Sequence, residues 1–139
     1  MRHACARPLL ALFLFGSAGS LIELLLLEHV DSATQWGPVV LLAVGSACAT
    51  ILIFRPEAAV RRLWGGLMAG YGIAGAVGVF LHLRGNREFE REIDAASAGL
   101  RLWKETLMGA TPALAPAVMT LLGALGWLAL REGPVERRP

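Results

Sequence analysis

LLALFLFGSAGSLIELLLL, residues 9–27, is the stretch that decides the fold. As an α-helix this run is about 28 Å long, which matches the hydrocarbon thickness of a bilayer. It contains one ionisable residue, Glu23. A carboxylate inside hydrocarbon is costly, so neighbouring helices have to accommodate it. The stretch therefore predicts a transmembrane helix that packs against other helices.

A cleaved signal peptide is the alternative for this stretch. Arg2 and Arg7 precede the apolar run, and the small residues Ser17-Ala18-Gly19 resemble a cleavage site. The apolar run continues well past Gly19, however, and this continuation favours a helix that is retained.

Three further apolar runs follow, at residues 37–54, 63–83 and 112–130. Hydrophobic residues make up 55% of the chain and the mean hydropathy is +0.56, whereas soluble domains are about 45–50% apolar. Charged residues are correspondingly few, at 17%. We therefore expect residues 1–139 to form a single membrane domain with four spans.

A polar segment, residues 85–108, separates the third run from the fourth. Its apolar residues recur at steps of four and three, which is the periodicity of one helix face. They are Phe89, Ile93, Ala96, Leu100, Trp103 and Leu107. We expect an amphipathic helix, broken near Gly99, that lies on the membrane surface or caps the bundle. The predicted fold is an all-α integral membrane protein: a four-transmembrane-helix bundle with an amphipathic extramembrane helix between helices three and four.

The basic residues predict the orientation. Arg2 and Arg7 lie before the first run, and Arg55, Arg61 and Arg62 lie between the second and third runs. The link at residues 28–36 has no Lys or Arg. Because cytoplasmic loops are enriched in basic residues, we expect both termini in the cytoplasm, with the plasma membrane as the location.

Glycines are concentrated in the third run, where they indicate close approach of helix backbones. Gly66-x-x-x-Gly70 is a small-xxx-small pattern. Two interpretations remain open, packing within the bundle and contact between copies of the chain. The candidate helix-packing residues are Gly66, Gly70, Gly75, Gly78 and Gly123.

Acidic and imidazole groups should gather on the outer face of the predicted bundle: Glu23, Glu28, His29, Asp31 and His82. One interpretation is structural, with Glu23 paired to a neighbour such as His82. A second is a site for a ligand, a proton or a metal such as zinc, copper or iron, which imidazole and carboxylate groups suit. A third is catalysis. No E-x-x-H, H-x-x-x-H or G-x-S-x-G spacing is present, so neither a metal nor a cofactor can be named.

Composition also bears on the class of function. The net charge is +2, and no basic cluster is interleaved with aromatic residues, so we expect no nucleic-acid partner. Cys5 and Cys48 form no C-x-x-C pair, which argues against thiol redox chemistry. The partners we expect are the lipid bilayer and either further copies of the chain or a larger membrane complex.

Three functions are compatible with these features. The preferred one is a non-enzymatic accessory or assembly subunit of a membrane complex. The first alternative is a small transport or ion- or metal-binding membrane protein that uses the outer cluster. The second alternative is a membrane redox enzyme that acts on a lipid-soluble substrate.

Overall fold

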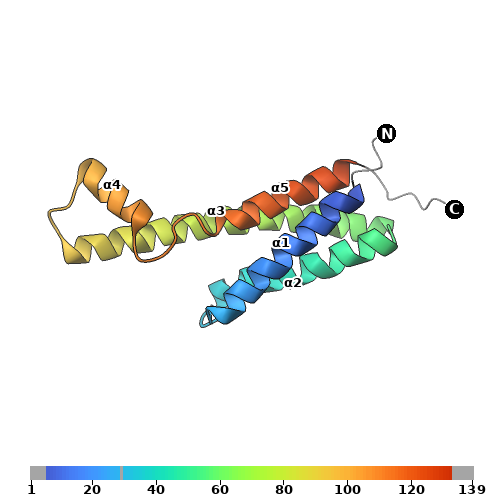
Figure 1. Ribbon diagram of the computed structural model, residues 1–139, viewed down its shortest axis with the longest axis horizontal. Helices are drawn as coiled ribbons and strands as arrows, with labels where there is room; N and C mark the ends of the chain where they lie inside the picture. The colour runs from blue at the N-terminus through green and yellow to red at the C-terminus, as the bar shows by residue number, and fades with distance from the viewer. Residues whose placement is uncertain (1–5, 29, 133–139) are drawn as a thin grey trace.

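The computed structural model describes residues 6–28 and 30–132, and every regular element in this part of the chain is a helix (Figure 1). Three of the helices are long and apolar enough to cross a membrane, whereas the sequence predicted four spans. The fourth predicted span, residues 112–130, contains a shorter apolar helix. The helices are α1 (Ala6–Leu26), α2 (Ala33–Phe54), α3 (Ala58–Ile93), α4 (Gly99–Met108) and α5 (Ala117–Arg131).

Four helices share one core. α1 and α3 each pack against both α2 and α5, so α1 and α3 lie across the core from each other. The buried residues of α1, such as Leu10 and Phe13, all lie in the first part of that helix. Figure 1 shows the reason: the α1–α2 pair meets α3 and α5 where α1 begins and α5 ends, and diverges from them toward the loop between α1 and α2. We call the end where α1 begins and α5 ends the termini end of the molecule.

An aromatic cluster forms the centre of this core. The rings of Phe13 and Trp64 have centroids 4.7 Å apart, and those of Phe13 and Tyr71 are 5.4 Å apart. Trp64 Nε1 donates to the carbonyl oxygen of Gly126 at 2.9 Å, and the Tyr71 hydroxyl donates to that of Leu41 at 2.9 Å. Burying either donor without a partner would be costly, so these hydrogen bonds fix the Trp64 ring against α5 and the Tyr71 ring against α2.

α3 is longer than the predicted third span. Its 36 residues correspond to about 54 Å, against about 30 Å of hydrocarbon. The helix continues past residue 83, through Gly85, because no proline follows before residue 94 and most of the residues there are good helix formers. Arg84 also forms an ion pair of 2.8 Å with Glu88 one turn later. The first part of the expected segment 85–108 thus belongs to α3.

α4 folds back beside this extension of α3. The turn uses Gly99, whose φ of +61° is in the left-handed region, and this is where a break was predicted. We call residues 84–108 the hairpin.

α5 begins at Ala117, later than the predicted span at residues 112–130. The residues before it form tighter bonds three residues apart, from Ala115 N to Pro112 O at 3.1 Å and from Ala117 N to Leu114 O at 3.0 Å. Pro116 explains this geometry, because a residue that precedes proline disfavours the α conformation. α5 therefore becomes a regular helix only after the proline.

Close contact between α3 and α5 depends on glycines of both helices. A Cβ atom at Gly123 would lie 2.9 Å from the Met68 carbonyl oxygen. A Cβ atom at Gly78 would lie 2.6 Å from the Pro116 side chain, and one at Gly75 would overlap Thr120. These three candidate residues thus lie where the two helices touch.

The remaining glycine positions differ. A Cβ at Gly70 would make an ordinary contact of 3.4 Å with Leu41, and one at Gly66 would meet no atom within 4 Å. Two close approaches were not among the candidates: Gly45 receives the Tyr71 ring, and Gly126 lies against Met68 and Trp64. At both positions an aromatic side chain of α3 is a close neighbour, Tyr71 at Gly45 and Trp64 at Gly126, and the spacing of the glycines does not reveal this.

Gly123→Ala is expected to destabilise the protein by about 1–3 kcal/mol, because the new methyl group would overlap a backbone oxygen that cannot move aside easily. The measurement is thermal unfolding in detergent. Gly66→Ala is the matched control, because it adds the same methyl group at a position with no atom in reach. Equal melting temperatures for the two variants would contradict the packing described here.

Candidate functional site

The predicted outer cluster is only partly within the described residues, because His29 lies outside them. Glu23, Glu28 and Asp31 are exposed, and His82 is half-buried. Glu28 has a φ of 51°, so the chain turns sharply directly after α1. The acidic residues therefore lie at the end where α1 and α2 diverge from the other helices.

Glu23 and His82 are not partners. Glu23 makes no side-chain hydrogen bond or ion pair with another described residue. His82 is on α3 and its Nδ1 lies 3.1 Å from the carbonyl oxygen of Pro112. Among residues 6–28 and 30–132, no three His, Cys, Asp or Glu side chains are placed to hold a metal ion. A site that includes His29 stays a prediction.

Asn86 is the most completely bonded polar side chain of the hairpin. It is 2% exposed, although it belongs to a charged segment. Its Nδ2 donates to the carbonyl oxygens of Thr106 at 3.0 Å and Thr111 at 2.8 Å. Its Oδ1 accepts from the Thr111 backbone N–H at 3.1 Å and from the Thr111 hydroxyl at 2.7 Å. Both donors and both acceptor positions of the amide are used.

We call this arrangement, together with His82 and Pro112, the Asn86 junction. His82 lies one helical turn before Asn86, so the two side chains hold the α4–α5 connection on the same face of α3. Gly109 completes the fit, because a Cβ there would lie 2.8 Å from Cγ of Asn86. The sequence analysis missed this junction. The four-residue spacing of His82 and Asn86 is the signal that could have found it.

A cluster of charges around Arg101 supports the tip of the hairpin. Arg101 Nε is 2.8 Å from Glu105, and a terminal nitrogen of the same guanidinium is 3.3 Å from Asp94. The Ser97 hydroxyl donates to the other oxygen of Glu105 at 3.0 Å. The hydrogen bond from Arg101 is the largest cause that lowers the pKa of Glu105 below its ordinary value. Exposed pairs of this kind contribute little energy individually, but together they fix the turn between α3 and α4.

The apolar stripe predicted for the hairpin is present but unpartnered. α4 packs on α3 through Leu102 and Thr106, which are buried. The stripe residues Leu100 and Trp103 are instead 86% and 58% exposed. We call the exposed apolar residues of this helix the α4 apolar face: Leu100, Trp103, Leu107 and Met108.

Comparison of the chain with protein-family models, with curated protein sequences and with solved structures found no match. The candidate site is therefore defined by geometry. It consists of a hairpin that the Asn86 junction attaches to the membrane-type helices and that carries the α4 apolar face. Cys48 is buried and forms no disulfide, and Cys5 lies outside the described residues.

Asn86→Asp is expected to destabilise the hairpin, because it replaces the N–H donors to Thr106 and Thr111 with an oxygen that faces their carbonyl groups. A buried polar group left unpaired costs about 1–3 kcal/mol. Hydrogen exchange of the α4 amides measures the effect, and protection should fall at least tenfold (about 1.4 kcal/mol). Arg87→Gln, at the exposed next position, is the control. Unchanged protection in Asn86→Asp would contradict the role of the junction.

Acid is expected to loosen the tip of the hairpin. Because the pKa of Glu105 is lower in the folded protein than its ordinary value of 4.5, its contribution to stability is fully present above pH 4.5. The contribution is lost as the pH falls through the lower, folded-state pKa. Hydrogen exchange at α4, corrected for intrinsic rates, should therefore be unchanged from pH 7 to 5 and increase below pH 4.5. Glu105→Gln should remove part of this dependence, and an identical profile in the variant would contradict it.

Proposed function

We propose that this chain is a non-enzymatic accessory or assembly subunit of a membrane complex and that the hairpin is its docking element. The observation that carries the proposal is the α4 apolar face, which is exposed on a hairpin that several specific bonds hold in place. The proposal includes a four-span bundle in which α1, α2, residues 63–83 of α3, and α5 with its preceding turn cross a plasma membrane. Both termini are then cytoplasmic and the hairpin is on the outer side.

The length of α3 supports the location of the hairpin in water. Residues 84–93 add about 15 Å to the helix beyond the apolar run, and they include Arg84, Arg87, Glu88, Arg91 and Glu92. Placing so many charged side chains in hydrocarbon would cost too much free energy. α4 runs back beside this charged extension, so it does not lie flat across the end of the bundle (Figure 1).

The chemistry of the α4 apolar face supports a protein partner. Burial of apolar surface stabilises by roughly 25 cal/mol per Å², so Leu100 and Trp103 in contact with water forgo this gain until a partner covers them. Tryptophan is enriched among the residues that dominate binding energy at protein interfaces. Arg101 and Lys104, on the same short helix, provide a charged rim.

The rigidity of the hairpin supports docking over incidental exposure. The Asn86 junction and the Arg101 cluster fix α4 on α3 before any partner binds. A preformed surface loses less conformational entropy on association than a flexible one. An apolar face on a frayed helix would not have this advantage.

The test is photo-crosslinking in native membranes, with a photoreactive residue in place of Trp103. One protein that is not this chain should form a discrete adduct and co-purify at a fixed ratio in gentle detergent. Leu100→Ser with Trp103→Ala should reduce co-purification about tenfold or more, since each interface anchor contributes over about 1 kcal/mol. Phe80→Ala is the control, because Phe80 is 62% exposed on the apolar part of α3.

Three results would contradict the proposal. One is a lone homogeneous particle in gentle detergent. The second is crosslinks to lipid only, which would indicate that the α4 apolar face lies in the bilayer surface. The third is crosslinks only to another copy of this chain, which would indicate a homo-oligomer rather than an accessory subunit.

A further inference from the structure

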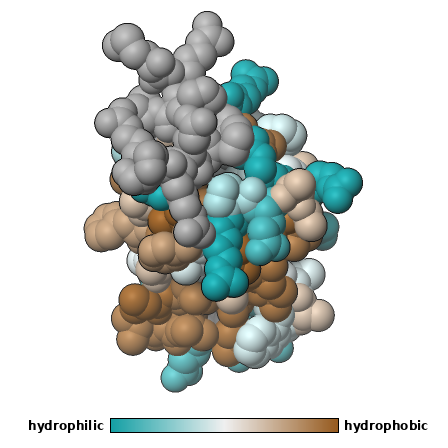
Figure 2. Space-filling view, turned by 90° about the vertical axis from the view of Figure 1, so that its right-hand side faces the viewer, coloured by the Kyte–Doolittle hydropathy of each residue, from teal (hydrophilic) through white to brown (hydrophobic). Residues whose placement is uncertain are grey.

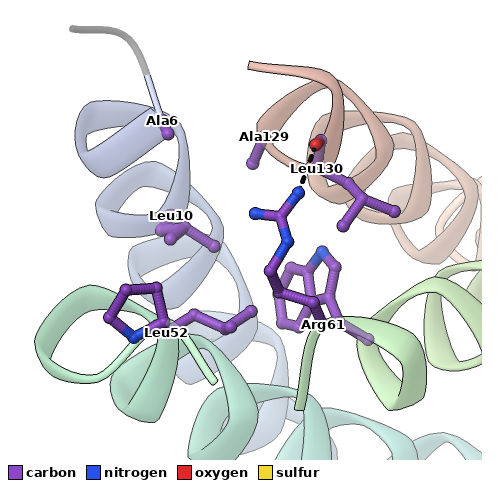
Figure 3. Close-up of a pocket in the computed structure, with 8 residues that line it drawn as sticks. Ala6, Leu10, Leu52, Arg61, Ala129 and Leu130 are labelled. Carbon is purple, nitrogen blue, oxygen red and sulfur yellow. Dashed lines mark hydrogen bonds between the residues drawn. The ribbon is translucent and has the colours of Figure 1, made fainter. Parts of the chain in front are cut away.

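A small pocket opens at the termini end, between the starts of α1 and α3 and the ends of α2 and α5 (Figure 3). Its volume is about 10 Å³, which is room for about one water molecule or one ligand oxygen. The walls are apolar apart from a single guanidinium group. The residues that matter are Ala6, Leu10, Leu52, Arg61, Ala129 and Leu130.

Arg61 is half-buried in this pocket and only part of its hydrogen-bonding capacity is used. One terminal nitrogen donates to the carbonyl oxygen of Leu130 at 3.0 Å, in the last turn of α5. The other terminal nitrogen points across the pocket toward Leu10 (Figure 3). A guanidinium carries several N–H donors, and no described carboxylate forms an ion pair with Arg61. The pocket therefore presents unused donors and a positive charge to an incoming acceptor.

The surroundings of the pocket are also basic. Glu57 and Glu132 are the acidic residues near this end among those described, and the basic residues outnumber them. Figure 2 faces this end and shows hydrophilic side chains on its upper right and centre, with apolar side chains below and beside them. The exposed basic residues are Arg7, Arg55, Arg62 and Arg131.

We propose that the Arg61 pocket binds a phosphate oxygen of an anionic phospholipid. Three observations support this occupant. The unused donors are on a guanidinium, which matches the geometry of phosphate oxygens. The pocket is too small for a whole head group, so a single oxygen enters and the rest of the head group stays outside the pocket. The ends of three apolar helices converge here, at the level where lipid head groups lie.

This site is independent of the hairpin, which is at the other end of α3. The lipid proposal can therefore be tested separately from the proposed docking function. Arg61 would then have two roles. One N–H donor stabilises the C-terminus of α5 through the Leu130 carbonyl, and the other donors remain for a ligand.

The experiment is native mass spectrometry of the purified full chain in detergent, titrated with phosphatidylglycerol or phosphatidylcholine. Phosphatidylglycerol should bind at one saturable site with at least tenfold preference over phosphatidylcholine. Arg61→Gln should weaken this binding about tenfold, as expected for loss of charge-assisted hydrogen bonds. Arg62→Gln is the matched control, because it removes the same charge from the adjacent exposed position and should leave the site intact.

A second variant separates lipid binding from folding. Arg61→Lys keeps the charge and a donor for the Leu130 carbonyl, so α5 remains capped, but a single ammonium cannot serve that carbonyl and a phosphate in the geometry of a guanidinium. Its affinity for phosphatidylglycerol should also fall several-fold while its melting temperature stays close to that of the original chain.

Four results would overturn the proposal. Equal binding of both lipids would show that no charge recognition occurs. Equal losses in the Arg61→Gln and Arg62→Gln variants would indicate diffuse attraction to the basic surface. Unchanged binding in Arg61→Lys would remove the requirement for a guanidinium. Displacement of phosphatidylglycerol by millimolar inorganic phosphate would indicate a site for a free anion instead of a lipid.

Discussion

The packing of α3 against α5 is the constraint on which the rest of the structure depends. The two helices run antiparallel in close contact, and α3 makes polar contacts with α5 and the connection before it along their whole length. Near the termini end Arg61 bonds to Leu130 O and Trp64 bonds to Gly126 O. In the middle Thr120 donates to Gly72 O at 3.4 Å, and at the far end His82 and Asn86 hold Pro112 and Thr111.

Nearly all of these contacts join a side chain to a backbone carbonyl. The Gly72 and Gly126 carbonyls lie inside helices, where each already accepts one bond, so the second lone pair is available only to a group of a helix that comes very close. Gly75, Gly78 and Gly123 allow that approach between α3 and α5. In an apolar environment, where no water competes, such interhelical bonds add to van der Waals packing and fix the register of the two helices.

The sequence predicted those structural features that a single segment determines by its own composition. Apolar runs predicted the three long helices, and Gly99 itself indicated where the polar segment would break. Close contact occurs at Gly75, Gly78 and Gly123, whereas Gly66 and Gly70, the two residues of the Gly-x-x-x-Gly pattern, make no such contact. The membrane orientation and the role of Glu23, by contrast, remain predictions.

The features that could not be predicted from the sequence depend on contacts between two segments of the chain. The length of α3 was underestimated because the end of an apolar run was taken as the end of a helix, whereas helix formers continue to Ile93. The burial of Asn86 was not predicted either. Its four-residue spacing from His82 places both residues on one helix face, but only the packing of the α4–α5 connection shows that this face is covered. The packing of Leu102 and Thr106 on α3, with the more apolar stripe left outside, was likewise not predicted.

Because that stripe is exposed, the residues that attach α4 to α3 differ from the residues that are available to contact another molecule. Had Leu100 and Trp103 packed on α3, the hairpin would have been more stable and would have presented a polar surface to water. Instead, Asn86 and the Arg101 cluster supply the specificity that holds α4 in place, through hydrogen bonds and charges that require little apolar area. Such a division leaves the apolar side chains available for contact with another molecule. It is also the arrangement that a stable preformed docking surface requires.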